Sequence, residues 1–395
     1  MRTDRLHNVY LDNNATTPIL PEVLEAMQPY FTEKFGNASA IYSRGREANA
    51  ALKKARESVA LLFGCRSAEV VFTSGGTEGD NLAILGIVAP GDHIITSAIE
   101  HSAVLNTCTY LEKLGCEITR LPVDGKGQVD PNGVREAIRK NTTLISIMMA
   151  NNETGVLQPV EEIGKIAAEL DICFHTDAVQ AAGKVSISVD QIGCDLLTIS
   201  GHKIHAQQGT GALFVRRGTS LKPLLHGGHQ ERGHRAGTEN VPGIVGLGKA
   251  CEIASAGLHD GSIDRLREWR DRFESGVLKS IEALGINGER APRVPNTSSI
   301  YFDYIGGEAL VVALDEKGIA ASAGAACSAG AREPSHVLVA MGLSSERARA
   351  SLRFSFGKQN SVGDVDYLLA VLPEVVQRLR DTSPIYKRAK SHASS

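Results

Sequence analysis

The sequence has no long apolar run and no excess of charge, and each absence excludes a class of protein. No apolar stretch approaches the ~18 residues of a membrane-spanning helix, and the opening residues MRTDRLHNVYLDNN contain no apolar signal-peptide core. Its 42 Lys and Arg residues nearly balance 45 Asp and Glu residues, for a net charge of −3. This balance gives no reason to expect a nucleic-acid partner. We therefore expect a soluble, cytoplasmic protein that binds neither nucleic acid nor a membrane.

The seven cysteines are scattered along the chain and none forms a CxxC pair, so neither a disulfide framework nor a zinc site is expected. Most such cysteines in a reducing compartment are small buried hydrophobic residues. Cys327 differs from the others because residues 323–331 contain almost no bulky side chains. We expect a segment of this composition to be mobile, which makes Cys327 the candidate reactive thiol.

The 395 residues are enough for two domains. Between about residues 45 and 216, helix-like stretches alternate with the short apolar runs EVVFTS, HIITSA, EITRLPV, LISIMMAN, CFHTDAV, LLTISGH and GALFVRR. This alternation predicts a wound α/β sheet. Apolar spacing predicts helices at residues 44–63 and 263–284, and a strand at 299–302. The change in pattern after residue 257 predicts a smaller α+β domain, and the tail at 387–395 is expected to be frayed.

Two glycine-rich segments are candidates for phosphate binding. In FTSGGTEGDN, residues 72–81, a strand leads into glycines and a helix predicted to start at Glu78. Glycines let the backbone approach an anion, and a helix N-terminus favours negative charge, although an ordinary strand–helix turn has the same pattern. Residues 243–250 fit GxxxxGK, but Ala250 stands where a Ser or Thr must bind Mg²⁺. An NTP-binding loop is therefore not expected there.

Two successive strand ends carry residues suited to one cofactor. Asp177 and Gln180 follow one apolar run, and Ser200, His202 and Lys203 follow the next. Ligands of open α/β sheets lie beyond the carboxyl ends of the strands. A lysine that forms an imine, an aspartate that keeps a pyridine nitrogen protonated and a glycine-rich helix start for a phosphate are together what pyridoxal phosphate requires.

Two further strand ends add suitable side chains. Asn152 in MMANNETG is suited, like Gln180, to hydrogen-bond the hydroxyl of the cofactor ring. His101 in AIEHSAV is suited to stack on the ring or to transfer a proton. The residues themselves therefore favour a pyridoxal-phosphate enzyme.

Motifs along most of the chain resemble, in order, those of the cysteine desulfurases, especially the nitrogen-fixation type. They are LDNNATTP (11–18), TSGGTEGDN, EHSAV, ANNETG, HTDAVQ, SGHK, GGHQERGHRAGTEN (227–240), SAGAACSAG (322–330) and LRFSFG (352–357). The resemblance implies a fold type I PLP-dependent transferase, with a mainly parallel seven-stranded sheet flanked by helices in a large domain at residues 18–256. Residues 1–17 and 257–395 would form the smaller α+β domain, which carries a mobile catalytic-cysteine loop at about 322–334. The family is homodimeric and converts L-cysteine to L-alanine, leaving a persulfide on a cysteine.

The resemblance also implies roles for individual residues. The implied catalytic residues are Cys327, Lys203 and His101. Cofactor binding falls to Gly76, Thr77, Asn152, Asp177, Gln180, Ser200, Gly201, His202 and Lys203, with Thr238 supplied to the neighbouring subunit. Substrate binding falls to Asn13, Asn152 and Arg353, whose planar fork suits a carboxylate. No intrinsic metal site is implied, but Cys327 could be a transient iron–sulfur ligand.

Three alternatives remain open: a selenocysteine lyase, an aminotransferase of the same fold and a non-catalytic assembly scaffold. Transamination needs no thiol, and a scaffold would not need Lys203, Asp177 and Cys327 together, so the set favours a desulfurase. The expected sulfur acceptor is an iron–sulfur scaffold or another acceptor protein. Nitrogenase maturation and general housekeeping both remain open as its purpose.

Overall fold

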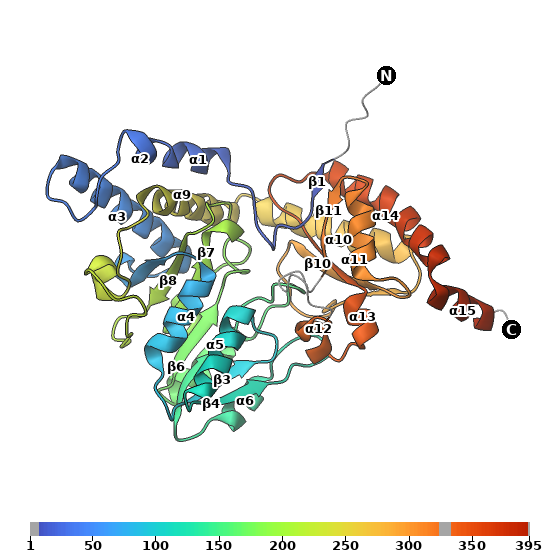
Figure 1. The fold of residues 1–395 in the computed structure, drawn as a ribbon, viewed down its shortest axis with the longest axis horizontal. Helices are drawn as coiled ribbons and strands as arrows, with labels where there is room; N and C mark the ends of the chain where they lie inside the picture. The colour runs from blue at the N-terminus through green and yellow to red at the C-terminus, as the bar shows by residue number, and fades with distance from the viewer. Residues whose placement is uncertain (1–7, 324–332, 394–395) are drawn as a thin grey trace.

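The computed structural model describes residues 8–323 and 333–393. Cys327, the predicted sulfur acceptor, lies outside these residues, as does most of the loop predicted at 322–334. Figure 1 shows the two parts into which the described chain folds, a larger sheet with its helices and a smaller part that includes the first and the last of the described residues.

Seven strands within the described residues form the larger sheet, in the order β2-β8-β7-β6-β5-β3-β4. The strands are β2 (Val70–Thr73), β3 (His93–Ser97), β4 (Glu117–Leu121), β5 (Thr142–Ser146), β6 (Cys173–Asp177), β7 (Leu196–Ser200) and β8 (Gly211–Val215). Strand β8 is antiparallel to both neighbours, and the other pairs are parallel. The seven apolar runs of the sequence are these strands, so the mainly parallel sheet is confirmed.

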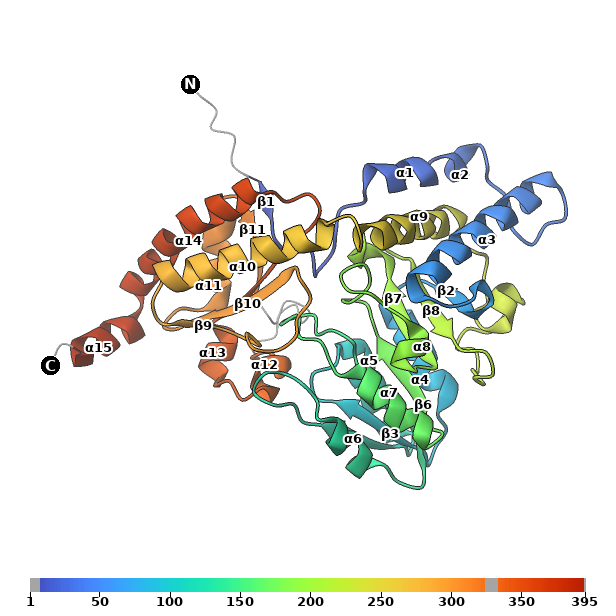
Figure 2. The ribbon, with the colours of Figure 1, turned by 180° about the vertical axis from the view of Figure 1, so that it is seen from behind.

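Helices cover both faces of this sheet, because alternate residues of its strands are apolar on both sides. Ile94 packs with α4 and α5, whereas its neighbour Ile95 belongs to the larger core formed with α3, α7 and α9. Figures 1 and 2 show these layers from opposite sides. The helices are α1 (Pro21–Met27), α2 (Pro29–Thr32), α3 (Ser43–Phe63), α4 (Gly76–Ile87), α5 (Ser102–Lys113), α6 (Pro131–Ala137), α7 (Val160–Glu169), α8 (Val189–Ile192) and α9 (Val241–Gly257).

The smaller part contains an antiparallel sheet in the order β12-β13-β10-β9 and a separate buried core around Phe273, Phe302 and Phe354. Its strands are β9 (Leu284–Ile286), β10 (Thr297–Phe302), β12 (Ser322–Ala323) and β13 (Ser351–Ser355). Its helices are α10 (Ser262–Ser280), α11 (Gly307–Asp315), α12 (His336–Ala340), α13 (Ser345–Arg349), α14 (Val362–Thr382) and α15 (Pro384–Ala393).

Two sequence expectations for the smaller part are wrong. The helix predicted at 263–284 ends at Ser280, because Ile281 is extended and Ala283 has a φ of 51°, and β9 follows instead. The tail predicted to be frayed continues as α15 up to Ala393. The Tyr386 ring lies 5.5 Å from that of Tyr304, so an aromatic contact holds the start of this helix against the smaller part.

The N-terminal segment joins the two parts. Strand β1 (Val9–Tyr10) pairs in parallel with β11 (Ile319–Ala320) of the smaller part. Only a few residues later, the backbone N–H of Thr17 donates to His202 O in the larger part, at 2.9 Å. Residues 12–16 therefore cross the boundary between the two cores, directly beside the end of β7.

Gly164 provides a test of the packing between α7 and α8. A Cβ atom on Gly164 would lie 1.8 Å from the carbonyl oxygen of Ile192, at the end of α8. Gly164→Ala should therefore destabilise the fold by roughly 1–3 kcal/mol, despite the better helix propensity of Ala. Thermal unfolding should show a lower Tm.

Gly133 in α6 is the matched control, because a Cβ atom on Gly133 would have its nearest neighbouring atom 3.9 Å away. Gly133→Ala should keep the Tm or raise it, because Ala in a helix is more stable than Gly by about 0.5–1 kcal/mol. Equal Tm changes in the two variants would contradict the packing described here.

Candidate active site

A cavity of about 260 Å³ lies at the carboxyl edge of the larger sheet, where several strands end side by side. Residues after β2, β3, β5, β6 and β7 reach it, and one residue of β13 reaches it from the smaller part. Its lining comprises Asn14, Ala15, Gly76, Thr77, Asp80, His101, Met148, Ala150, Asn152, Asp177, Val179, Gln180, Ser200, His202, Lys203 and Arg353. Most of the residues predicted from the sequence thus come together here.

Lys203 and Asp177 enter this cavity from neighbouring parallel strands. Lys203 closes a short 3₁₀ turn (Gly201–Lys203) directly after β7, and its Nζ donates to the backbone oxygens of Asn14 and Ala15 at 2.7 and 2.6 Å. Asp177 ends β6, is buried, and accepts the Val179 N–H at 2.8 Å. Burial raises the pKa of Asp177, and the hydrogen bond from Val179 N–H and the nearby Lys203 act against that rise. A protonated pyridine nitrogen is a cation that would keep this carboxylate ionised.

The glycine-rich segment forms a site for an anion. Helix α4 begins at Gly76, two residues before the predicted start at Glu78, because the N–H of Gly79 already bonds Gly75 O at 3.1 Å. Gly75 has φ 153° and ψ −174°, a conformation open to glycine alone. A Cβ on Gly76 would lie 2.9 Å from Val179 Cγ2. The first N–H groups of a 12-residue helix, with Thr77 beside them, therefore face the cavity and suit a phosphate.

His101 is held as a neutral base. It caps α5, and its Nδ1 accepts the backbone N–H of Ala103 at 3.1 Å. Burial lowers the pKa of His101, and the positive charges of Lys203 and His336 lower it further, although Asp177 opposes them. Because Nδ1 accepts a hydrogen bond, the single proton of the neutral ring is assigned to Nε2.

Arg353 reaches the cavity from β13. Its Nη2 donates to Asp12 Oδ1 at 2.6 Å and its Nη1 to Asn152 O at 2.9 Å, while its Nε has no hydrogen-bond partner among the described residues. The side chain is almost fully buried. A buried guanidinium with an unfilled donor suits a substrate carboxylate.

The structure does not bring all the predicted residues to this cavity. Thr238 is exposed, Gly201 is buried beneath the lining, and Cys327 is outside the described residues. Asn13 lines a neighbouring cavity instead, with its amide bonded to Ser355 O and to Gln359.

Nearly the whole chain matches known proteins. Residues 9–368 match the model of the family described as aminotransferase class-V. The chain is 52% identical to cysteine desulfurase IscS of Methanosarcina thermophila, over 95% of this chain and 94% of that protein, and 49% identical to cysteine desulfurase IscS of Dictyoglomus turgidum, over 98% and 99%.

Solved structures agree with these relatives. A NifS-like protein, 37% identical, superimposes with a TM-score of 0.87 over 94% of this chain and 100% of that one. A structure of SspA in complex with cysteine, 40% identical, does so with a TM-score of 0.79 over 88% and 99%. The chain belongs to the cysteine desulfurases of the class-V aminotransferase family. These desulfurases are pyridoxal-phosphate enzymes, and the cavity described above has the lysine, the carboxylate and the anion site that this cofactor needs.

Two polar cavity residues of this desulfurase, Asn14 and Asp80, were not predicted from the sequence. Asn14 adjoins Asn13 in the same motif, and its backbone oxygen accepts the Lys203 amine. Asp80 is buried one turn after Thr77 on α4, with Oδ1 3.6 Å from His175 Nε2. Burial and the charge of Asp177 raise the pKa of Asp80 well above its ordinary value. The i, i+3 spacing from Thr77 was the available signal for Asp80.

Two features are absent from residues 8–323 and 333–393. No group of three His, Cys, Asp or Glu side chains is arranged to hold a metal ion. None of the helices there has the length and apolar character needed to cross a membrane.

Glu100, next to His101, makes the stability of the apoenzyme depend on pH. Its carboxyl is fully buried, 2.5 Å from Ser97 Oγ and bonded by Met148 N–H, and burial raises its pKa to about 8. The unfolded chain loses this proton near its ordinary pKa of 4.5, so between these values the folded state holds more protons. This contribution to stability is present at low pH and is lost as pH rises towards 8.

Glu100→Gln should therefore flatten the fall of stability between pH 5 and 8, by an amount on the order of a few kcal/mol. Thermal unfolding of the apoenzyme across this range measures it. Glu162→Gln, at an exposed site of α7, is the control and should keep the wild-type slope. A Glu100→Gln slope equal to that of the wild type would show that this carboxyl is not protonated in the folded state.

Proposed function

We propose that this desulfurase releases L-alanine from L-cysteine in the cavity at the carboxyl edge of the sheet, with Cys327 taking the sulfur as a persulfide. The observation that carries this proposal is the meeting of Lys203, Asp177 and the start of α4 around one cavity that Arg353 reaches from the other core. The persulfide sulfur then passes to an iron–sulfur scaffold or another acceptor protein.

The sulfur transfer balances without an external oxidant. The C–S bond of cysteine breaks, an S–S bond forms to Cys327, and protons complete the alanine methyl group. An acceptor thiol then attacks the persulfide, takes its outer sulfur and restores the Cys327 thiol.

The cysteines within the described residues support Cys327 by contrast. Burial is the largest cause that raises the pKa of each of them: Cys65, Cys108, Cys116, Cys173, Cys194 and Cys251. For Cys108 the value is about 12. Because the thiolate is the nucleophile, these thiols are poor sulfur acceptors near neutral pH.

The remaining roles follow from the geometry of the chain's own residues. Pyridoxal phosphate, when bound, supplies an electron sink that lets bonds at the substrate carbons break. Lys203 would hold the cofactor, Asp177 would pair with its ring nitrogen, and the start of α4 would hold its phosphate. His101, in its neutral form, moves a proton at the substrate. The substrate carboxylate binds Arg353 and replaces part of the hydrogen bonding that Arg353 now makes with Asp12.

The test of sulfur transfer compares two cysteines. Cys327→Ala should keep the cofactor and bind cysteine but release almost no alanine, because no thiolate is left to attack the substrate sulfur. Cys108→Ala is the matched control and should retain wild-type turnover. Wild-type enzyme given cysteine without reductant should gain one sulfur atom on the peptide that contains Cys327, as measured by mass spectrometry after alkylation. Extra sulfur on another peptide, or full turnover by Cys327→Ala, would refute the assignment.

Thr238 tests whether each active site needs a second copy of the chain. It is exposed and lies outside the cavity of its own chain, which is consistent with a role in the partner's phosphate site. We expect a homodimer in which Thr238→Ala weakens cofactor binding and Lys203→Ala abolishes turnover. In a mixed dimer of these two variants, one site has both native residues.

Co-expression and purification of that mixed dimer should therefore recover activity that neither variant shows alone. Light scattering establishes the oligomeric state of each sample. A mixture no more active than the sum of the separate variants would contradict the sharing of sites.

A further inference from the structure

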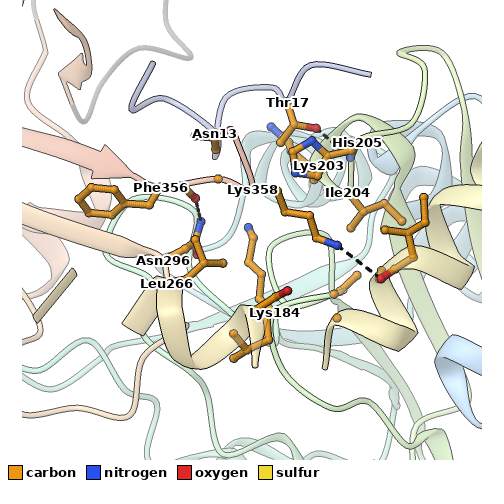
Figure 3. A pocket seen from close by; sticks show the side chains of 18 of the residues that line it. Asn13, Thr17, Lys184, Lys203, Ile204, His205, Leu266, Asn296, Phe356 and Lys358 are labelled. Carbon is orange, nitrogen blue, oxygen red and sulfur yellow. Dashed lines mark hydrogen bonds between the residues drawn. The ribbon is translucent and has the colours of Figure 1, made fainter. Parts of the chain in front are cut away.

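A second cavity, of about 50 Å³, lies behind the cofactor cavity, between α9, α10 and the segment 13–17 (Figure 3). Lys184, Lys203 and Lys358 line it, together with His205 and apolar side chains such as Phe356. Among the described residues that line the two cavities, Lys203 alone belongs to both. The Lys203 side chain therefore separates the two cavities, and the groups behind it can act on its position.

Lys184 carries a buried amine on the rear side of Lys203. Its Nζ donates to Gln180 Oε1 at 2.8 Å and to Asn14 Oδ1 at 3.4 Å. Its described hydrogen-bond partners are thus amide oxygens of residues that line the cofactor cavity. Burying an amine is costly, and two amide oxygens do not neutralise its charge.

The Gln180 amide is held at both ends. Its Nε2 donates to Asn14 O at 2.9 Å, while its Oε1 accepts from Lys184. A backbone carbonyl can only accept, so the amino group of Gln180 must lie on the Asn14 side. Asn14 O also accepts the Lys203 amine at 2.7 Å. The Gln180 amino group and the reactive amine of Lys203 therefore share one acceptor and lie beside each other.

We propose that Lys184 is a positioning residue, which holds Gln180 and Asn14 so that the Gln180 amino group faces the cofactor oxygen next to Lys203. The proposal rests on the proposed function, because it takes Lys203 as the cofactor lysine. With Lys184 in place, an N–H group stabilises the ionised ring oxygen. Without it, the Gln180 amide keeps only its bond to Asn14 O, so its amino group is held less firmly towards that oxygen.

Several positively charged or titratable groups surround the Lys184 amine. Lys203 and Arg353 both act on it with positive charge, and Lys358 and His205 line the same cavity. Burial, followed by Lys203 and Arg353, lowers the pKa of Lys184 to about 7. An amine donates N–H groups whether or not it is protonated, so the bond to Gln180 persists on both sides of this value.

The test is a pH titration of the colour of the holoenzyme, which reports the link between cofactor and lysine and needs no substrate. Lys184→Met keeps the size of the side chain and removes its donors. The pH of the colour change should move upward by about half a unit or more, because the N–H that favours the deprotonated form is lost. Lys358→Met is the matched control, since Lys358 lines the same cavity but bonds Ile253 O, and it should leave that pH unchanged.

A double-mutant cycle separates positioning from simple charge. In a Gln180→Leu background, Lys184→Met should cause no further shift, because the amide through which Lys184 acts is gone. An equal shift in both backgrounds would show that Lys184 acts by its charge alone and would overturn the proposal. If Lys184→Met does not fold, Lys184→Leu, which also lacks donors, takes its place in the cycle with the same criterion.

The same titration on the Cys327→Ala enzyme distinguishes a failure of this proposal from a failure of the proposed function. Sulfur transfer can fail there while the colour change and its dependence on Lys184 remain. Loss of the coloured cofactor link in Lys203→Ala, by contrast, tests the assignment of the cofactor lysine itself.

Discussion

The ending of parallel strands at one edge of a sheet is the constraint on which this active site depends. Strands β6 and β7 are paired in register from His175 to Asp177 with Leu196 to Thr198, so the residues that follow them emerge side by side. Asp177 and Lys203 can face a small ring between them only because of this pairing. The start of α4 completes the same edge through β2, whose antiparallel partner β8 links it to β7.

The second requirement is a connection between the two cores, and the segment at residues 12–16 provides it. Asp12 pairs with Arg353 of β13, and Asn14 bonds Lys203, Gln180 and Thr297. The segment thereby brings Arg353 of the smaller part to a cavity whose other lining residues belong mostly to the larger part. The cavity consequently depends on both cores.

Burial shapes the chemistry of the site more than any single ion pair does. It raises the pKa of the carboxyls of Asp80 and Glu100 and lowers that of His101 and Lys184, which in each case favours the neutral form of the group. When these groups are neutral, they add no charge to the site. The ions that remain then mainly balance the charges of the cofactor and the substrate. This arrangement suits an enzyme that must stabilise negative charge on a bound ring.

The sequence by itself determined the parts that depend on short-range patterns. The helix capped by Gly64, the strands with apolar residues on both faces, and the placement of Asp177 and Lys203 after successive strands all follow from local periodicity and from the chemistry of a few side chains. Only the tertiary structure decided that α4 begins at Gly76, that Arg353 is held by Asp12, and that Lys184 lies behind Lys203 and bonds Asn14. Contacts between residues 170 to 341 positions apart depend on how the whole chain packs, and no local pattern records that packing.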